Sequence, residues 1–550
     1  MKLVLPKPSR GLLFDRLLPI EMNEFDVDRL LPSLFYLVVT NGSQRKDRVN
    51  EATDLDRYVR ALAAHPRMQG FDTDEGRRLL DRWLRASVIR VSRVGKVRGS
   101  EQIEYVLPLT ILAYKTGLPA ETSRQRRVHT FLYKILLDAL GTSSGGPPPN
   151  AQLRGLFTNA FGRGVSIESG PAFNGRYDGT AELDIHALLT LLYLDGFQAT
   201  PARTKDPLDT RSVALPAAAL NLAEDLLGYL KAWSGRMPSL ALTNGLAALI
   251  GIGLFAYTRR LAYATNDLVQ TGRLDPSTPP MYVDFTRQRG GVSEEMARAA
   301  VERDLEEVGI FYESAVLLRT LERFASTRPD LRERLEALDT PRSLELLVGL
   351  LDHPRIEARA EAEIESIQEE TREACETEAD RENAEALFRA MEARYPEPVR
   401  RAARLLAAAQ EQRGVQKHIQ WYWSIGGLRK PYGVLAGSIR GRRNWRYSMS
   451  DDLLATLVHV AMLEPAGAGS PSVIRSRIRL SEFLEFLETR YAILVDRPPE
   501  FLDSAASRAG AKDNVGALRA RLRQMGYFEA LSDDFSAQYL RIPQSTEVGS

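Results

Sequence analysis

The sequence predicts a mainly α-helical protein of several domains, with a long acidic helix in its second half. Apolar residues recur at helical spacing through most of the 550 residues. Hydrophobic residues make up 44% of the chain, which is enough for a packed interior. The few strand-like runs are short. Because the chain is too long for one ordinary core, we expect three or four domains.

The N-terminal region has the pattern of a winged helix. A mostly apolar helix or strand at 27–40 is followed by helices at 52–64 and 74–85, the last with Thr73 as its N-cap. Two strand-like runs, SVIRVSR and QIEYVLP, then flank a glycine-bearing connector. The third helix is expected to turn four apolar residues inward: Leu79, Leu80, Trp83 and Leu84. Helix, helix, basic helix and basic hairpin form the winged-helix variant of the helix-turn-helix.

This N-terminal hairpin has two possible roles that the residues leave open. In the first, it is a DNA-binding wing, and its contacts are Arg90, Arg93, Lys96 and Arg98. In the second, the winged helix contacts only proteins.

The middle of the chain reads as helical with two loop segments. GTSSGGPPPN at 141–150 is a linker, and the glycine-rich piece at 162–180 lacks the Walker A pattern, so we expect a surface loop. Residues 182–350 show helical spacing almost throughout, and the helices expected there include 216–233, 293–306 and 311–325. Within them, Met237–Thr258 is uncharged and long enough to span a membrane, but Pro238, Asn244 and several glycines interrupt it. We therefore interpret it as a buried core helix and expect no membrane partner.

The region from 356 to 394 is predicted to be one long acidic helix. Glu357–Glu392 holds thirteen acidic and four basic residues, with sparse apolar positions. Such a helix is typically solvated, or it bridges partners. A sharper alternative is that it lies against the basic stretch that follows, as an acidic mimic of nucleic acid.

The basic stretch Arg413–Ser450 has eight Lys or Arg residues, no acidic residue and three of the five tryptophans. Positive charge with aromatic faces suits a phosphate backbone. The expected contacts are Arg429, Lys430, Arg440, Arg442, Arg443 and Arg446. The alternative is that Trp421, Tyr422 and Trp423 are core residues and the arginines are only solvated.

The C-terminal region shows a second winged-helix pattern. Ser450 caps one helix, Ser481 opens another, and Asn514–Met525 forms a third. A hairpin with the return strand AQYLRI follows. The third helix is basic, as a recognition helix should be, and the arginines expected to point outward are Arg519, Arg521 and Arg523.

The runs RYSMSDDLLATLVHVAM, LSEFLEFLETRYAILVDRPP and LRARLRQMGYFEALSDDFSAQYLRIP, at about 445–543, resemble the C-terminal winged-helix segments of large accessory proteins of bacterial anti-phage defence clusters. The resemblance implies a non-enzymatic role in a multi-protein DNA-surveillance system. It transfers no functional residue.

No catalytic motif or metal-ligand spacing stands out in the chain. The six histidines are scattered, Cys375 is the single cysteine, and Walker A, GxSxG and Rossmann patterns are missing. We therefore expect no catalytic residue, no metal and no cofactor, and a reducing, cytoplasmic location.

The function that follows is a DNA-binding scaffold subunit with other protein subunits as partners. Two alternatives stay open: a protein-interaction subunit resembling a kleisin of an SMC-type complex, and a divergent nuclease or other enzyme without a recognisable motif. The expected units are 1–140 (winged helix), 141–181 (linker and loop), 182–350 (helical core), 351–395 (acidic helix), 396–449 (basic connector), 450–543 (winged helix) and 544–550 (tail).

Overall fold

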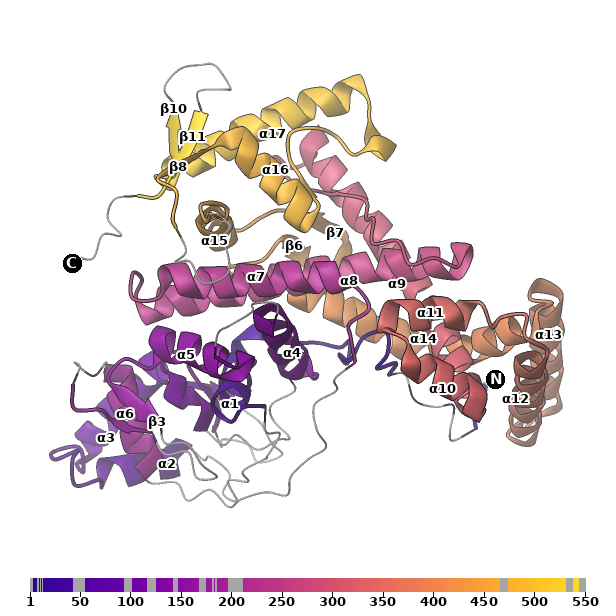
Figure 1. Cartoon of the computed structure of the whole chain (residues 1–550), viewed down its shortest axis with the longest axis horizontal. Helices are drawn as coiled ribbons and strands as arrows, with labels where there is room; N and C mark the ends of the chain where they lie inside the picture. The colour runs from indigo at the N-terminus through magenta and orange to yellow at the C-terminus, as the bar shows by residue number, and fades with distance from the viewer. Residues whose placement is uncertain are drawn as a thin grey trace.

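The computed structural model describes residues 3–6, 9, 11, 13–42, 55–92, 101–115, 125–141, 147–167, 175–180, 183, 185–195, 211–428, 430–464, 473–530 and 538–543. Helices dominate these residues, as the sequence predicts, and the sheets are small (Figure 1). One connected cluster of buried apolar side chains extends from Leu3 to Leu540. The units expected from the sequence therefore share one core in the described part of the chain.

Four helices form the centre: α7 (Pro216–Trp233), α8 (Ser239–Thr271), α9 (Val292–Ser326) and α14 (Pro398–Ile425). Their close approach relies on glycine, because a Cβ at Gly253 of α8 would lie 2.2 Å from Leu222 of α7. Among the described residues, α8 alone is long and apolar enough to cross a membrane, and 78% of its most apolar window is buried inside the protein. This burial supports the interpretation as a core helix.

The N-terminal region covers one side of α7 and α8 (Figure 1). Its first elements are η2 (Val27–Arg29), α1 (Leu31–Val39), α2 (Leu55–Ala63), α3 (Asp74–Ser87), β1 (Ile89–Ser92), β2 (Gln102–Val106) and η3 (Ile111–Lys115). The remaining ones are α4 (Val128–Gly141), α5 (Pro149–Phe161), β3 (Val165–Ile167), β4 (Gly175–Tyr177) and α6 (Ile185–Asp195). Strands β1 and β2 pair antiparallel at the expected hairpin. The expected surface loop at 162–180 also contains a hairpin, β3–β4.

The prediction of one long acidic helix is wrong in one respect, because two consecutive helices occupy this region. They are α12 (Pro354–Glu373) and α13 (Glu378–Arg394). Thr377 separates them, since its side chain accepts a hydrogen bond from the Asp380 N–H and starts a new helix. Together with α10 (Pro329–Ala337) and α11 (Thr340–Val348), they lie beside α9 and α14 on the right of Figure 1.

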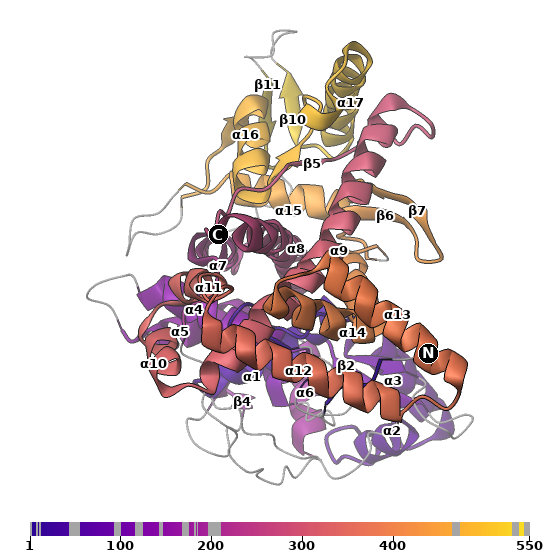
Figure 2. The same ribbon diagram turned by 90° about the vertical axis from the view of Figure 1, so that its right-hand side faces the viewer.

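The basic connector also differs from expectation, because its first half is helical. Helix α14 continues to Ile425, and a hairpin of β6 (Leu435–Ser438) and β7 (Gly441–Tyr447) follows. The hairpin lies along α9 and projects from the body on the right of Figure 2.

The C-terminal unit packs on α8 and α9 through its helices. In chain order it contains α15 (Asp451–Ala461), β8 (Arg477–Arg479), α16 (Leu480–Tyr491), β9 (Ile493–Leu494), η4 (Glu500–Leu502), α17 (Ala505–Gln524), β10 (Phe528–Ala530) and β11 (Gln538–Arg541). Three strands form an antiparallel sheet in the order β10-β11-β8. Strand β9 instead pairs in parallel with β5 (Met281–Tyr282), which ties the unit to the segment before α9.

Candidate nucleic-acid interface

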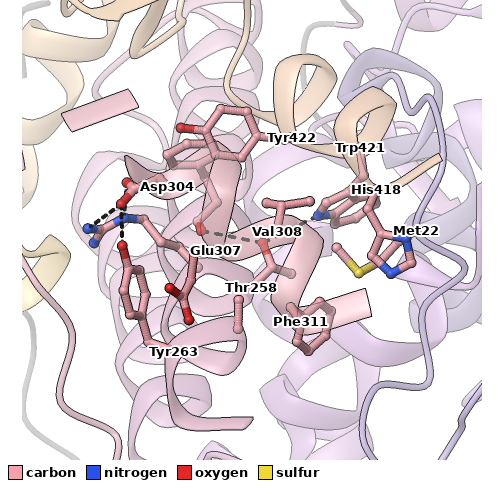
Figure 3. Close-up of a pocket in the computed structure, with 13 residues that line it drawn as sticks. Met22, Thr258, Tyr263, Asp304, Glu307, Val308, Phe311, His418, Trp421 and Tyr422 are labelled. Atoms are coloured by element: carbon pink, nitrogen blue, oxygen red, sulfur yellow. Dashed lines mark hydrogen bonds and ion pairs between the residues drawn. The ribbon is translucent and has the colours of Figure 1, made fainter. Parts of the chain in front are cut away.

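The basic hairpin β6–β7 is anchored on a buried charge network centred on Asp304 of α9. Asp304 is 2% exposed and accepts hydrogen bonds from Arg259 Nε at 2.5 Å and Arg303 NH2 at 3.0 Å. Two tyrosine hydroxyls also donate to it, Tyr263 at 2.7 Å and Tyr447 of β7 at 2.5 Å. Figure 3 shows Asp304 and Tyr263 at one side of a small cavity of about 20 Å³, with Trp421 and His418 opposite.

Charges in this network are mutually compensated. Burial alone would raise the pKa of Asp304, but the neighbouring Arg259 and Arg303 hold that pKa below its usual value. Burial also raises the pKa of Tyr447 and of Tyr422 well above the usual value, so both hydroxyls stay protonated as donors. Their hydroxyls lie 2.6 Å apart, which links α14 to β7. The network therefore fixes the base of the hairpin.

The tryptophans of the basic stretch belong to this core, so the aromatic part of the nucleic-acid prediction is wrong for two of them. Trp421 and Trp445 are each 1% exposed. Trp421 Nε1 donates to Thr258 Oγ1 at 3.3 Å, and Trp445 Nε1 donates to the Ser438 carbonyl at 2.7 Å. Buried indoles cannot stack on bases, and the alternative that these residues are structural is the better one.

The tip of the hairpin presents the arginines that the sequence singled out. Arg440, Arg442 and Arg443 are exposed. Within the described residues none of the three forms an ion pair, and Arg442 contacts only a neutral side chain, Gln416, at 2.9 Å. Arg446 lies at the base, half-buried, 3.5 Å from Glu294 of α9.

Lys430, another of the predicted contacts, serves the fold instead. Lys430 Nζ lies 2.7 Å from both Asp26 and Asp28 of the N-terminal segment. Burial lowers its pKa, yet the two carboxylates raise it by more, so the pKa of Lys430 ends above its usual value. Arg429 is outside the described residues. No ion pair of the stretch reaches α12 or α13 in the described part of the chain, so the acidic-mimic hypothesis gains no support.

Helix α17 displays a basic stripe that contains two of the three arginines predicted to point outward. Arg523 is exposed and Arg519 half-exposed, whereas Arg521 is only 8% exposed and pairs with Asp451 over the ring of Phe285. Residues two apart on a helix lie about 200° apart, so Arg521 cannot share a face with Arg519 and Arg523. Lys512, which the sequence reading missed, is exposed in line with them.

The N-terminal hairpin is only partly described. Arg90 is exposed and lies across from Tyr105 on the paired strand. Arg93, Lys96 and Arg98 are outside the described residues. The predicted inward face of α3 is half wrong, because Leu80 and Leu84 are buried while Leu79 is 42% and Trp83 46% exposed.

Two further arginines near the hairpin went unnoticed in the sequence. Arg287 and Arg289 are exposed on the segment between β5 and α9. The sequence feature that could have identified them is the basic run TRQRGG, which lies directly before a helix. In the described ranges, no three His, Cys, Asp or Glu side chains come together as a metal site.

Comparison with known proteins gives one family. A family model described as Methylation-associated defense system protein MAD7 matches residues 7–543. No curated protein and no solved structure matches the chain.

Proposed function

We propose that this chain, which belongs to the Methylation-associated defense system protein MAD7 family, is a non-catalytic, cytoplasmic DNA-binding scaffold subunit of its defence system. Family membership makes it a component of a methylation-associated defence system and supports the defence association that the resemblance implied. The family match covers residues 7–543, whereas the resemblance was drawn from the C-terminal third. The DNA-binding part of the proposal rests on one observation. Three exposed arginines that pair with no acidic residue in the described ranges stand at the tip of a hairpin whose base is fixed in the core.

Rigid presentation is what makes these arginines suited to phosphate. A guanidinium can bind a phosphate through two parallel hydrogen bonds, and less binding energy is lost when its support is already ordered. Tyr447 ties strand β7 to Asp304 of α9 through a buried hydrogen bond, and the Trp445 indole joins β7 to β6 by donating to the Ser438 carbonyl. The arginines Arg440, Arg442 and Arg443 then extend from an ordered base into solvent.

The C-terminal unit supports the same function. Its order of elements, helix, strand, helix, helix and hairpin, with the sheet order β10-β11-β8, is that expected of a winged helix. Helix α17 occupies the recognition-helix position, and its outward stripe is Lys512, Arg519 and Arg523. On its inward side, Asn514 bonds to the backbone at Val283, Phe285 and Val495, which fixes the orientation of the stripe.

The kleisin alternative predicts two terminal domains joined by an extended tether. Both terminal units instead pack on the central helices and share one apolar core. A compact body with a basic face favours direct DNA binding over a kleisin-like role as a tether.

The test is DNA affinity as a function of salt. Fluorescence anisotropy with a labelled duplex of about 20 bp should show tight binding at roughly 50 mM salt that weakens steeply toward roughly 200 mM. The variant R440A/R442A/R443A should bind more weakly to every sequence, and its log–log salt slope should be shallower by about 3, because each lost phosphate contact removes about 0.9.

The matched control is R332A/R334A/R355A, which removes three exposed arginines from α10 and α12. It should bind as the wild type does. No binding by the wild type at low salt, or equal salt slopes for the two triple variants, would refute the proposal.

The scaffold part has a separate test. Proteins of the same defence system should remain attached to the tagged chain in its native cell after nuclease treatment. Loss of every such protein on nuclease treatment would mean that DNA, and not this chain, joins them.

A further inference from the structure

The segment 285–291 lies between the basic hairpin and α17. On one side, the Phe285 N–H donates to Asn514 Oδ1 of α17 at 2.7 Å, and a Cβ at Gly510 would lie 2.9 Å from Val292. On the other side, Arg446 of β7 lies 3.5 Å from Glu294 in the first turn of α9. Figure 2 shows the hairpin, the start of α9 and α17 reaching the same side of the molecule. The segment therefore connects the two basic elements.

Its backbone is held in an uncommon conformation. Arg287 has φ of 54°, in the left-handed region that residues other than glycine seldom adopt. The buried Asp284 carboxylate maintains it by accepting from the N–H groups of Thr286 at 3.0 Å and Arg287 at 3.1 Å and from Ser293 Oγ at 2.7 Å. Such conformations persist where the surroundings enforce them, and they concentrate at functional sites.

The charge presented here is positive and uncompensated. Arg287 and Arg289 are exposed, and within the described residues neither forms an ion pair. Arg521 lies close enough to Arg287 for the two charges to repel, and Asp451 is already paired with Arg521. Glu294 is likewise occupied, by Arg446 and by the Gly290 N–H at 2.7 Å. Asp451 and Glu294 are therefore engaged by other groups.

We propose that Arg287 and Arg289 form the middle of one continuous basic surface, so that a single DNA duplex contacts the hairpin tip, this segment and α17 together. The inference rests on the proposed DNA-binding function and adds the site that unites its two parts. Without this segment, the hairpin and α17 would be two separate sites.

The dimensions suggest a minimum duplex length. Six residues of strand from Arg446 to Arg440 extend roughly 20 Å. Thirteen residues of α17 from Gly510 to Arg523 extend about 20 Å. The surface therefore extends at most about 40 Å, and a duplex of roughly 12 bp or more is long enough to contact both ends at once. A duplex of about 8 bp, roughly 27 Å long, does not cover the surface at its full extent.

The experiment compares duplexes of about 8 and about 20 bp in the full-length protein. The variant is Arg287→Gly with Arg289→Ala, because glycine adopts the left-handed conformation without strain. We expect its salt slope on the long duplex to be shallower by about 2, and the preference for the long over the short duplex to fall at least about tenfold. Arg287→Lys with Arg289→Lys should restore most of the slope, whereas R332A/R334A should match the wild type.

The outcomes separate the two proposals. If R440A/R442A/R443A weakens binding but the Arg287→Gly/Arg289→Ala variant equals the wild type on both duplexes, the continuous surface is wrong and the DNA-binding function stands. If the wild type binds neither duplex at low salt, both proposals fail.

Discussion

Replacing Asp304 with asparagine should destabilise the protein and loosen the basic hairpin. Asparagine keeps the size of the side chain but removes the charge that compensates Arg259 and Arg303. Each Asp304 oxygen accepts hydrogen bonds from two residues, one oxygen from Arg259 and Tyr447 and the other from Arg303 and Tyr263. In asparagine an NH2 group replaces one of these oxygens and faces its donors. Since the site is buried, the uncompensated charge cannot be solvated.

The expected loss in free energy of unfolding is about 3–5 kcal/mol, the range found when one partner of a buried ion pair is removed. Urea denaturation followed by tryptophan fluorescence measures it, because Trp421 and Trp445 lie in the same core. The control is Asp330→Asn, which breaks an exposed pair with Arg328 and should leave the midpoint unchanged. A loss below about 1 kcal/mol for Asp304→Asn would refute the view that this network anchors the hairpin.

Three other changes test the supports of the interface. Burial lowers the pKa of His459 to about 4, below the usual 6.5 or so of an unfolded chain, so the unfolded state binds the extra proton first as pH falls. The stability that neutral His459 contributes is complete above about pH 6.5 and should be lost toward about pH 4, by up to about 3 kcal/mol. The variant His459→Gln should therefore show a smaller drop in melting temperature between these two pH values. Asn514→Ala leaves three buried backbone groups without a partner and should cost at least about 3 kcal/mol in urea denaturation, while an unchanged midpoint would show that α17 is held by other contacts. Gly437→Ala should cost about 1–3 kcal/mol and weaken DNA binding, because Gly437 has φ of 140° and a Cβ there would lie 2.8 Å from Trp445 Cδ1; wild-type fluorescence and affinity would contradict this.

Features set by local periodicity were predictable from the sequence. The spacing of apolar residues located helix α7 at its observed bounds, and alternation located both strands of the N-terminal hairpin. The expected helices at 293–306 and 311–325 were found, but joined as one helix, α9. Glycine at 309 separates them in the sequence, yet packing against α14 continues the helix through it.

Features that depend on tertiary contacts were not predictable. Helix α14 has basic, aromatic and glycine residues mixed together, and only its tertiary packing explains why Trp421, which contacts Thr258 of α8 and Phe25, is a core residue. The inward position of Arg521, by contrast, was predictable from helical spacing alone, since residues two apart on a helix lie about 200° apart. The role proposed for Arg287 and Arg289 likewise depends on contacts between segments distant in the sequence. Arg446 of β7 lies beside Glu294, and Asn514 of α17 accepts from the Phe285 N–H.

The salt dependence of duplex binding by the wild-type protein tests the central claim most directly. The basic surface offers eight exposed or half-exposed cations: Arg287, Arg289, Arg440, Arg442, Arg443, Lys512, Arg519 and Arg523. If all of them contact phosphate, the slope of log affinity against log salt concentration should be about −7 on any duplex sequence of about 20 bp. A slope near zero, or no binding at low salt, would contradict the claim that this face binds DNA.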